Sequence, residues 1–555
     1  MSERTVLERN LLALSALDPE LGARISGEKP RPDIIFLPTP RGVPVPAQRL
    51  KQRALPYHST VDPLREGEKI SQMYRAEGYL VFLGLGGGFQ VLPFLEEKEI
   101  SRLVLVEKHS GFFRAVLENM DLRPILLDPR VRLLVDRSAE QLKSFLLDDY
   151  IPAIDGDLQT VPLRTAFEAE QEYFQELLRA MKEVSGRLAD DYTVQAHFGK
   201  RWFVNTLANL PRAQKANLAV RPARRVIVTG AGPSLELQMP QIPGLRGDGI
   251  IIASDTSLPA LLAFGIKPDL VLTLDCQQIS YQHFLQGLPR DIPLVADLAS
   301  PPVLTRLTDR ILFFASSHPF SQYLSNHWRR FPTIDTSGGN VSHAAVSLAQ
   351  FLGAEEIILM GMDFSYPEGK CYSRGTYIYP YFAALEHRLA TLESLFFSFL
   401  LKNSAILKER TGDCFRYTTP PMISYKERLE SFVKDGEARI LQWPGKGVPL
   451  TLPRRRAGST RAPASRIFSA GAPRTDWRTF LSSYLEQVSS LPEPTLPLSR
   501  YLGTLGAEQR SLWITQYPAA SHFREALRRE NPDGAELLRR VRRWTISMIL
   551  RYLDR

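Results

Sequence analysis

The residues of this 555-residue chain that are best suited to chemistry stand where apolar runs end in glycine, serine or aspartate. The run 226–229 is followed by Gly230, Gly232, Pro233 and Ser234. A strand that leads through a glycine-rich turn into a serine-capped helix directs free backbone N–H groups beyond the strand end. We therefore expect an anion-binding turn, with a plain strand-to-helix connection as the alternative.

Two further apolar runs lead to carboxylates. The predicted strand 249–253 is followed by Asp255, and after a predicted helix over 258–264 the strand 270–274 is followed by Asp275. Polar residues at the carboxyl ends of neighbouring strands are typical of a parallel α/β sheet that binds a nucleotide. Such carboxylates accept hydrogen bonds from ribose hydroxyls or a cytosine amino group. Helix capping is the alternative role.

A second glycine-rich cluster precedes a predicted helix over 341–352, and the predicted strand 357–360 then leads to Asp363. Because a helix N-terminus attracts negative charge, we expect this cluster to hold the carboxylate or phosphate of a donor substrate. Its members are Thr336, Ser337, Gly338 and Gly339. Asp363 completes the predicted donor-binding set.

Taken together, these segments resemble two related families. G-x-G-P-S-L at 230–235, T-S-G-G at 336–339 and G-M-D-F-S-Y at 361–366 are similar to the bacterial sialyltransferases that use CMP-sugars without a metal. With S-D-T-S-L-P at 254–259 added, the pattern over residues 224–390 looks more like the motility-associated factor (Maf) proteins, which are flagellin glycosyltransferases.

The resemblance implies an activity and its partners. A nonulosonic acid, sialic-like and exemplified by pseudaminic or legionaminic acid, would pass from a CMP-sugar to Ser or Thr hydroxyls of flagellin, alone or with its export chaperone. The reaction would support flagellar assembly and motility. It would use no cofactor and no metal, because in the sialyltransferases two tyrosines donate hydrogen bonds to the leaving phosphate. The matching positions are Tyr366 and Tyr372, and packing within a loop is their alternative role.

The same resemblance implies a histidine as general base, near the start of a helix beyond the aspartate motif. His387 is the first candidate, although it falls within a predicted continuous helix over 381–401. His318 is the second candidate and His343 the third. Imidazole suits the role because its pKa lies near neutral pH.

Two other functions remain open. An archaeal pterin diphosphokinase family shares the G-x-G-P-S-L and S-D-T patterns, and it would use ATP with Mg²⁺ held by carboxylates such as Asp255 and Asp275. A non-catalytic flagellin-binding scaffold is the third possibility. The two tyrosines favour the metal-free transferase over the kinase.

An earlier α/β unit offers a possible second site. The predicted strand 79–83 is followed by Gly84 and Gly86, and the next predicted strand, 103–106, leads to Glu107. An acidic residue about twenty positions after a glycine-rich turn is the spacing with which Rossmann-like domains bind ribose. A purely structural unit is the alternative.

The chain is long enough for several domains. We predict an α/β protein with a Rossmann-like N-terminal domain, a central parallel sialyltransferase-like (GT-A-like) domain and a helical C-terminal domain. The predicted boundaries are 1–75 for a helix with short strands, 76–160 for the Rossmann-like domain, 161–222 for a helical connector, 223–450 for the transferase domain, 451–470 for a linker and 471–555 for the C-terminal domain.

Composition indicates an ordinary globular protein, with 44% hydrophobic and 23% charged residues. Three widely separated cysteines suggest neither a disulfide framework nor a zinc site. No long apolar run is present, so we expect no transmembrane segment and a cytoplasmic location. Residues 451–555 contain 18 arginines, no lysine and 9 acidic residues, and therefore carry a charge equal to the net +9 of the whole chain. Since the rest is balanced, we expect no nucleic-acid partner and a C-terminal part that steers a protein acceptor.

Overall fold

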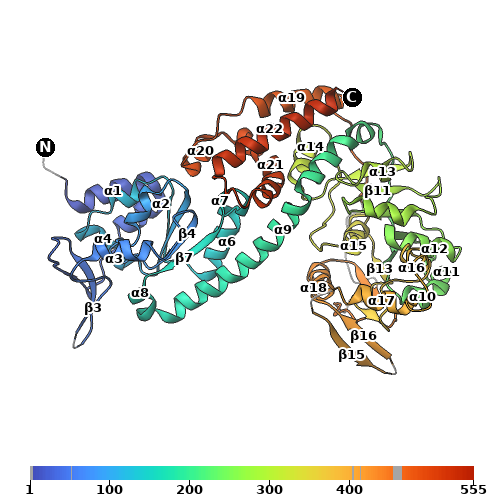
Figure 1. Cartoon of the computed structure of the whole chain (residues 1–555), viewed down its shortest axis with the longest axis horizontal. Helices are drawn as coiled ribbons and strands as arrows, with labels where there is room; N and C mark the ends of the chain where they lie inside the picture. The colour runs from blue at the N-terminus through green and yellow to red at the C-terminus, as the bar shows by residue number, and fades with distance from the viewer. Residues whose placement is uncertain (1–3, 52, 403–404, 413, 454–465, 555) are drawn as a thin grey trace. The chain divides into compact units, whose positions relative to one another are not determined.

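The computed structural model describes residues 4–51, 53–402, 405–412, 414–453 and 466–554 (Figure 1). The chain forms two compact units, each made of two separate stretches: unit 1 is Met1–Lys200 with Gln487–Ser547, and unit 2 is Arg201–Glu486 with Met548–Arg555. The predicted C-terminal domain, 471–555, is thus divided between the units. Most of the predicted linker, 454–465, lies outside the described residues.

Unit 1 contains a four-stranded parallel sheet in the order β6-β5-β4-β7. Its strands are β4 (Gly78–Leu83), β5 (Ile100–Glu107), β6 (Val131–Val135) and β7 (Leu158–Pro162). All six residues of β4 are buried, as expected for a central parallel strand covered on both faces. The predicted Rossmann-like sheet is confirmed.

The other elements of unit 1 precede, connect or follow the strands of this sheet in the chain. A small antiparallel sheet contains β1 (Ile34–Leu37), β2 (Val45–Arg49) and β3 (Ala54–Pro56). The helices are α1 (Val6–Leu17), α2 (Pro19–Ser26), α3 (Pro63–Ser71), the 3-10 helix η1 (Leu92–Glu96), α4 (Ser110–Asn119), α5 (Arg123–Leu126), α6 (Ala139–Asp149), α7 (Pro152–Asp155), α8 (Arg164–Ala169), the first part of α9 (Gln171–Lys215), α20 (Leu498–Thr504), α21 (Ala507–Ala526) and most of α22 (Gly534–Leu553).

The late helices complete the core of unit 1. Trp513 of α21 and Leu537 of α22 are fully buried. Helix α21 also approaches α9 closely, because a Cβ on Gly199 would lie 1.8 Å from the Pro518 carbonyl oxygen. The guanidinium of Arg524 donates from Nε to the Ala153 carbonyl of α7 at 2.6 Å. Residues separated by more than 300 positions in the sequence therefore form one core.

Unit 2 is built on a seven-stranded parallel sheet in the order β12-β11-β10-β9-β8-β13-β17. Its strands are β8 (Arg225–Thr229), β9 (Ile250–Ser254), β10 (Leu270–Thr273), β11 (Leu294–Asp297), β12 (Ile311–Phe314), β13 (Glu356–Met360) and β17 (Arg439–Gln442). The chain proceeds outward from β8 to β12 and then returns to the other side of β8. This reversal is the topological switch point at which open α/β sheets bind ligands.

Helices and a second small sheet accompany this sheet. The helices are α10 (Leu235–Gln238), η2 (Met239–Gln241), α11 (Ile242–Arg246), η3 (Asp255–Ser257), α12 (Leu258–Ala263), η4 (Gln278–Phe284), α13 (Pro302–Thr305), α14 (Pro319–His327), α15 (Val341–Phe351), α16 (Ile378–Ala383), α17 (Leu392–Leu400), α18 (Pro420–Lys434) and most of α19 (Trp477–Ser489). The antiparallel sheet β14-β16-β15 consists of β14 (Tyr366–Pro367), β15 (Leu407–Thr411) and β16 (Cys414–Thr418).

The predicted continuous helix over 381–401 is wrong. The chain forms α16 and α17, with a turn between them in which His387 and Ala390 pair through their backbones. Thr391 takes an extended conformation, and its hydroxyl accepts the Ser394 N–H as the N-cap of α17. A capping residue inside an apolar helical pattern thus starts a new helix.

The arginines of α22 are largely paired within unit 1. Arg539 and Arg540 donate to Glu536, and Arg542 pairs with Glu493. The predicted basic face of this helix is therefore partly neutralised. Among the described residues, no helix has the length and apolar character needed to cross a membrane.

Candidate functional site

Two glycine turns lie back to back at the switch point, at the carboxyl ends of β8 and β13. A Cβ on Gly230 would lie 2.6 Å from the Gly361 carbonyl oxygen, and one on Gly361 would lie 2.3 Å from that of Gly230. Gly361 also has a positive φ of 63°. Only glycine fits such a close approach of two backbones.

The expectation that the first turn presents free N–H groups is wrong. Gly230 donates to the Met360 carbonyl and Gly232 to the Gly361 carbonyl, both at 2.8 Å. The Ser234 N–H donates to Oδ2 of Asp363 at 2.9 Å. These donors are used to join β8 to β13, because the second turn reaches the first from the neighbouring strand.

Ser234 is also not the side-chain cap that the sequence predicts. It has a helical φ and ψ, and its hydroxyl makes no capping bond to α10. Instead, Oγ accepts the Lys446 N–H at 2.8 Å. Pro233 follows Gly232 in the same turn, and its carbonyl accepts the Glu236 N–H. Burial raises the pKa of Asp363, which lies in the same junction.

The second glycine cluster lies beside the first turn. Asn340, at the N-cap of α15, accepts the His343 N–H at 3.0 Å. Ser342, two residues after Asn340, lies in the first turn of α15, and a Cβ on Gly230 would lie 3.2 Å from the Ser342 Oγ. The structure therefore brings the start of an 11-residue helix to the switch point. Such a start attracts anions through its N–H groups and dipole.

Other residues of this cluster are engaged within the protein. The Ser337 N–H donates to Asp335 at 2.7 Å, and the Gly339 N–H donates to the Thr336 carbonyl at 3.2 Å. Gly338 packs on the ring of His343, which is buried and lies 3.7 Å from Asp335. Burial lowers the pKa of His343.

Asp255 and Asp275 lie at the ends of the paired strands β9 and β10, as predicted. Oδ2 of Asp255 accepts the Thr273 hydroxyl at 2.7 Å, and Oδ1 accepts the Thr256 N–H at 2.7 Å. Oδ1 of Asp275 accepts the Gln277 N–H at 2.9 Å. Burial raises the pKa of Asp275, and the nearby carboxylate of Asp255 raises it further.

The segment after β14 crosses the first glycine turn and carries Tyr372. The Ser373 N–H donates to the Ala231 carbonyl at 2.8 Å, and the Arg374 N–H donates to the Glu236 carboxylate at 2.8 Å. Gly375 packs against Ala260 of α12. These contacts fix Tyr372 over the carboxyl ends of β8 and β9.

Tyr372 lies among other aromatic and acidic groups. Burial raises the pKa of its hydroxyl, with further contributions from Tyr377, Tyr366 and the carboxylate of Asp255. Burial likewise raises the pKa of Tyr366. Both phenols therefore remain protonated donors at neutral pH. Tyr372 therefore lies near both Tyr366 and Asp255.

His283 is a side chain of this region that sequence reasoning missed. Its Nε2 lies 3.4 Å from the Thr256 hydroxyl, and its ring meets the edge of Tyr377 with centroids 4.7 Å apart. The buried Nδ1 has no hydrogen-bond partner among the described residues. The available signal was its place in η4, a short helix shortly after the strand end at Asp275.

The other predicted histidines lie elsewhere in unit 2. His387 is exposed in the turn before α17, where its Nδ1 accepts the Leu389 N–H at 3.3 Å. His318 precedes α14, beyond the edge strand β12, and stacks on Trp202 with centroids 3.9 Å apart. Burial lowers the pKa of His318 to about 4. Neither contact involves Asp255, Tyr366 or Tyr372.

The possible second site in unit 1 is occupied by its own side chains. A Cβ on Gly84 would lie 2.4 Å from the Cβ of Ala166, and one on Gly86 would lie 2.3 Å from Nε2 of His58. The buried Glu107 accepts the Leu85 N–H at 3.1 Å, and burial raises its pKa. This packing favours a structural role for the turn.

Two family models match separate parts of the chain. Residues 51–143 match the glycosyltransferase Maf N-terminal domain, and residues 203–369 match a family described as 6-hydroxymethylpterin diphosphokinase MptE-like. A solved structure described as a Maf glycosyltransferase from Magnetospirillum magneticum AMB-1 is similar to this chain, with a TM-score of 0.60. The match covers 99% of this chain and 96% of the Magnetospirillum chain. The N-terminal part of the chain is thus similar to the Maf family. At 16% identity, the likeness to the Magnetospirillum structure is one of fold.

Each of the sequence relatives matches only part of the chain. One uncharacterized protein of Treponema pallidum (strain Nichols) is 32% identical over 31% of this chain and 82% of its own length. Another is 30% identical, and the chain spans about half of it, 54%. The 6-hydroxymethyl-7,8-dihydropterin pyrophosphokinase of Pyrococcus furiosus (strain ATCC 43587 / DSM 3638 / JCM 8422 / Vc1) is 33% identical over 26% of this chain and 59% of its own length.

Proposed function

We propose that unit 2 is a glycosyltransferase that moves a nonulosonic acid from a CMP-sugar to Ser or Thr hydroxyls of flagellin in the cytoplasm, before export. The observation that carries the proposal is the placement of Tyr372. Its phenol, which stays protonated, lies near Tyr366 and Asp255 at the carboxyl ends of the strands. Phenolic donors in a buried site stabilise charge that develops on a departing phosphate.

The donor nucleotide is proposed to bind between the start of α15 and the Tyr372 segment. The N–H groups at the start of α15 would face the phosphate, and the ends of β9 and β10 would face the ribose and base. Asp255 and Asp275 supply acceptors there for ribose hydroxyls and the cytosine amino group. The Gly230 and Gly361 turns position these elements rather than bind the phosphate with their own N–H groups.

His283 is the histidine best placed to act as general base. In the transfer, the acceptor oxygen forms a bond to the anomeric carbon while the bond from that carbon to the phosphate oxygen breaks. The acceptor proton passes to the neutral imidazole, and CMP departs with its phosphate hydrogen-bonded by the tyrosines. We propose His283 in place of His387 and His318, because neither of these two contacts Asp255, Tyr366 or Tyr372.

The decisive experiment combines binding and transfer. Calorimetric titration with CMP, with and without a chelator, should give the same affinity, and CMP-pseudaminic or CMP-legionaminic acid should label flagellin. Tyr372→Phe should lower transfer roughly 10²-fold with little change in CMP affinity. Tyr281→Phe, which changes an exposed tyrosine in η4, is the matched control.

An ATP-dependent diphosphokinase is the second candidate, and the MptE-like match over residues 203–369 favours it. That match ends before Tyr372, and the kinase reaction requires no phenolic donor at this position. Binding that prefers ATP and is lost in chelator would support the kinase instead. CMP binding without any transfer would support a non-catalytic flagellin-binding scaffold.

A further inference from the structure

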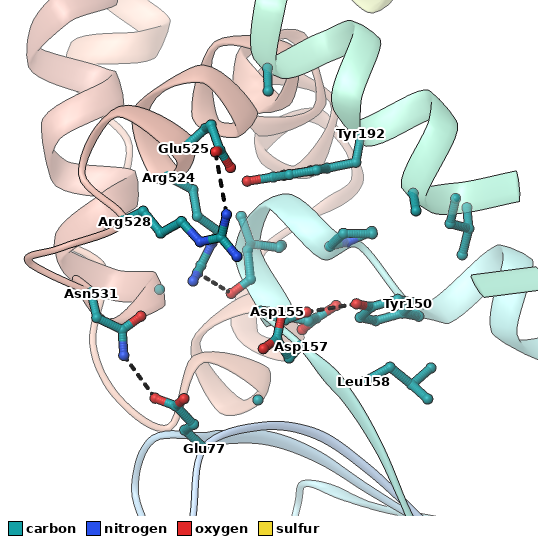
Figure 2. Close-up of a pocket in the computed structure, with 18 of the residues that line it drawn as sticks. Glu77, Tyr150, Asp155, Asp157, Leu158, Tyr192, Arg524, Glu525, Arg528 and Asn531 are labelled. Atoms are coloured by element: carbon teal, nitrogen blue, oxygen red, sulfur yellow. Dashed lines mark hydrogen bonds and ion pairs between the residues drawn. The ribbon is translucent and has the colours of Figure 1, made fainter. Parts of the chain in front are cut away.

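Unit 1 contains a cavity of about 960 Å³ that none of the predicted site residues line. It lies by the amino ends of β4 and β7, the opposite sheet edge from the Gly84 turn, and is bordered by α7, one face of α9 and the connection between α21 and α22 (Figure 2). Its volume falls at the upper end of the range for small-molecule sites.

Most charges of this cavity are already paired with one another. Arg75 forms an ion pair with Asp157 at 2.8 Å. Asn531 donates to Glu77 at 2.8 Å, and Arg528 lies 3.7 Å from Glu525 (Figure 2). A paired carboxylate keeps free lone pairs, and a paired guanidinium keeps free N–H groups. The wall therefore offers many donors and acceptors, with carboxylates in excess of arginines.

Arg524 and Asp155 add one donor group and one acceptor group. Arg524 donates to the Ala153 and Ile154 carbonyls, and no described carboxylate lies within salt-bridge distance of it. Asp155 accepts the Ile151 N–H at 2.7 Å, and burial raises its pKa to about 6. Because these two groups have opposite polarity, a ligand beside them meets both a donor and an acceptor.

Two tyrosines supply apolar surface. Tyr150 donates its hydroxyl hydrogen to the Gly156 carbonyl at 2.6 Å. Tyr192 extends from α9 toward Arg524, and no hydrogen bond to its hydroxyl is recorded among the described residues (Figure 2). An aromatic face beside alternating donors and acceptors fits a sugar ring, whose C–H groups are apolar and whose hydroxyls both donate and accept.

We propose that this cavity binds a neutral saccharide. Each hydroxyl would accept from an arginine or asparagine N–H and donate to a carboxylate oxygen, so that the existing ion pairs stay intact. A cationic ligand would instead lie close to Arg524, and an anionic ligand close to Asp157 and Glu525. This site is separate from the proposed transfer site in unit 2 and does not depend on it.

The test applies the full chain to an array that carries neutral oligosaccharides, acidic oligosaccharides and lysine- or arginine-rich peptides. Ala189→Trp should block the cavity, since Ala189 lines it and is exposed. Tyr192→Ala should remove the aromatic face. Val194→Trp is the matched control, because Val194 is exposed on the same helix outside the lining.

We expect retention of at least one neutral oligosaccharide, and its calorimetric affinity should fall at least 10-fold in Ala189→Trp and Tyr192→Ala but not in Val194→Trp. CMP affinity should be unchanged in all three variants, which separates this proposal from the transferase proposal. No retention of neutral oligosaccharides, retention unaffected by Ala189→Trp, or preference for the acidic glycans or the peptides would each overturn it.

Discussion

His283 is the side chain whose role is most open to a direct test by substitution. A general base takes the acceptor proton in the transition state, so its loss should slow transfer without weakening donor binding. His283→Gln should lower the transfer rate by about 10²-fold or more, while CMP affinity is retained. Steady-state transfer rates and calorimetric CMP titration measure the two effects.

His387→Gln is the comparison variant, because His387 is the position that resemblance alone would select. It is exposed in the turn before α17, so its substitution should leave both the transfer rate and the CMP affinity unchanged. A loss of transfer in His387→Gln together with full transfer in His283→Gln would reverse the assignment.

The buried carboxyl group of Asp297, at the end of β11, should make the stability of the folded protein depend on pH. It is fully buried, and burial raises its pKa to about 6, against about 3.9 in an unfolded chain. Between these values the unfolded state releases the proton first, so stability falls as the pH rises. The effect corresponds to about 2 to 3 kcal/mol.

Asp297→Asn removes this titration. The melting temperature of the wild type, measured relative to Asp297→Asn, should therefore decrease from pH 4 to pH 7. Asp248→Asn, at an exposed position, serves as the control. A constant difference between the wild type and Asp297→Asn would show that Asp297 ionises normally in the folded protein.

At the scale of elements, the two glycine turns should be sensitive to a single methyl group. Gly361→Ala places a Cβ 2.3 Å from the Gly230 carbonyl oxygen at a positive φ, so β8 and β13 must separate. We expect a loss of roughly 1 to 3 kcal/mol in stability together with weaker CMP binding. Thermal unfolding and CMP titration measure the two effects.

Gly265→Ala separates backbone strain from the close contact. Gly265 also has a positive φ, of 73°, but an added Cβ there would meet nothing within 4 Å. Its cost should be limited to about 1 kcal/mol of backbone strain, with CMP affinity unchanged. Equal effects of the two substitutions would mean that the junction of the turns is not tightly packed.

The parallel strands that lead to the site were predictable because each is a short apolar run that ends in a polar residue. The runs before Gly230, Asp255 and Asp275 correspond to β8, β9 and β10. The use of the turn's N–H groups was not predictable, since Asp363 reaches Ser234 from 129 positions away. His283 was missed for a related reason: its neighbour Tyr377 lies in a later segment whose path depends on tertiary contacts.

At the scale of the whole molecule, the excess positive charge can be tested without removing any helix. Residues 468–486 are part of unit 2, where Trp328 donates to the Thr475 carbonyl, while α21 and most of α22 complete unit 1. Truncation would therefore damage both units. Charge reversal is the cleaner change at exposed arginines that form no ion pair with another described residue, and Arg510, Arg529 and Arg551 meet this description.

If these arginines attract the acceptor protein, the triple Arg→Glu variant should lower kcat/KM for flagellin several-fold at low salt and much less at high salt. Hydrolysis of the CMP-sugar should not change. The control is charge reversal of Lys51, Arg65 and Lys98, which are exposed and far earlier in the chain. Equal losses in the two variants would indicate a general charge effect.

The division of each unit into two stretches has a consequence for biosynthesis. The first 200 residues of unit 1 emerge from the ribosome before residues 201–486 are made, and only then do the helices that complete the core follow. At typical translation rates this interval lasts roughly 15 to 60 s. During it, the surfaces of the nascent sheet and α9 that later contact α21 and α22 are uncovered. Chaperones that bind exposed apolar segments would therefore bind this polypeptide during its synthesis, before the last helices of unit 1 have been made.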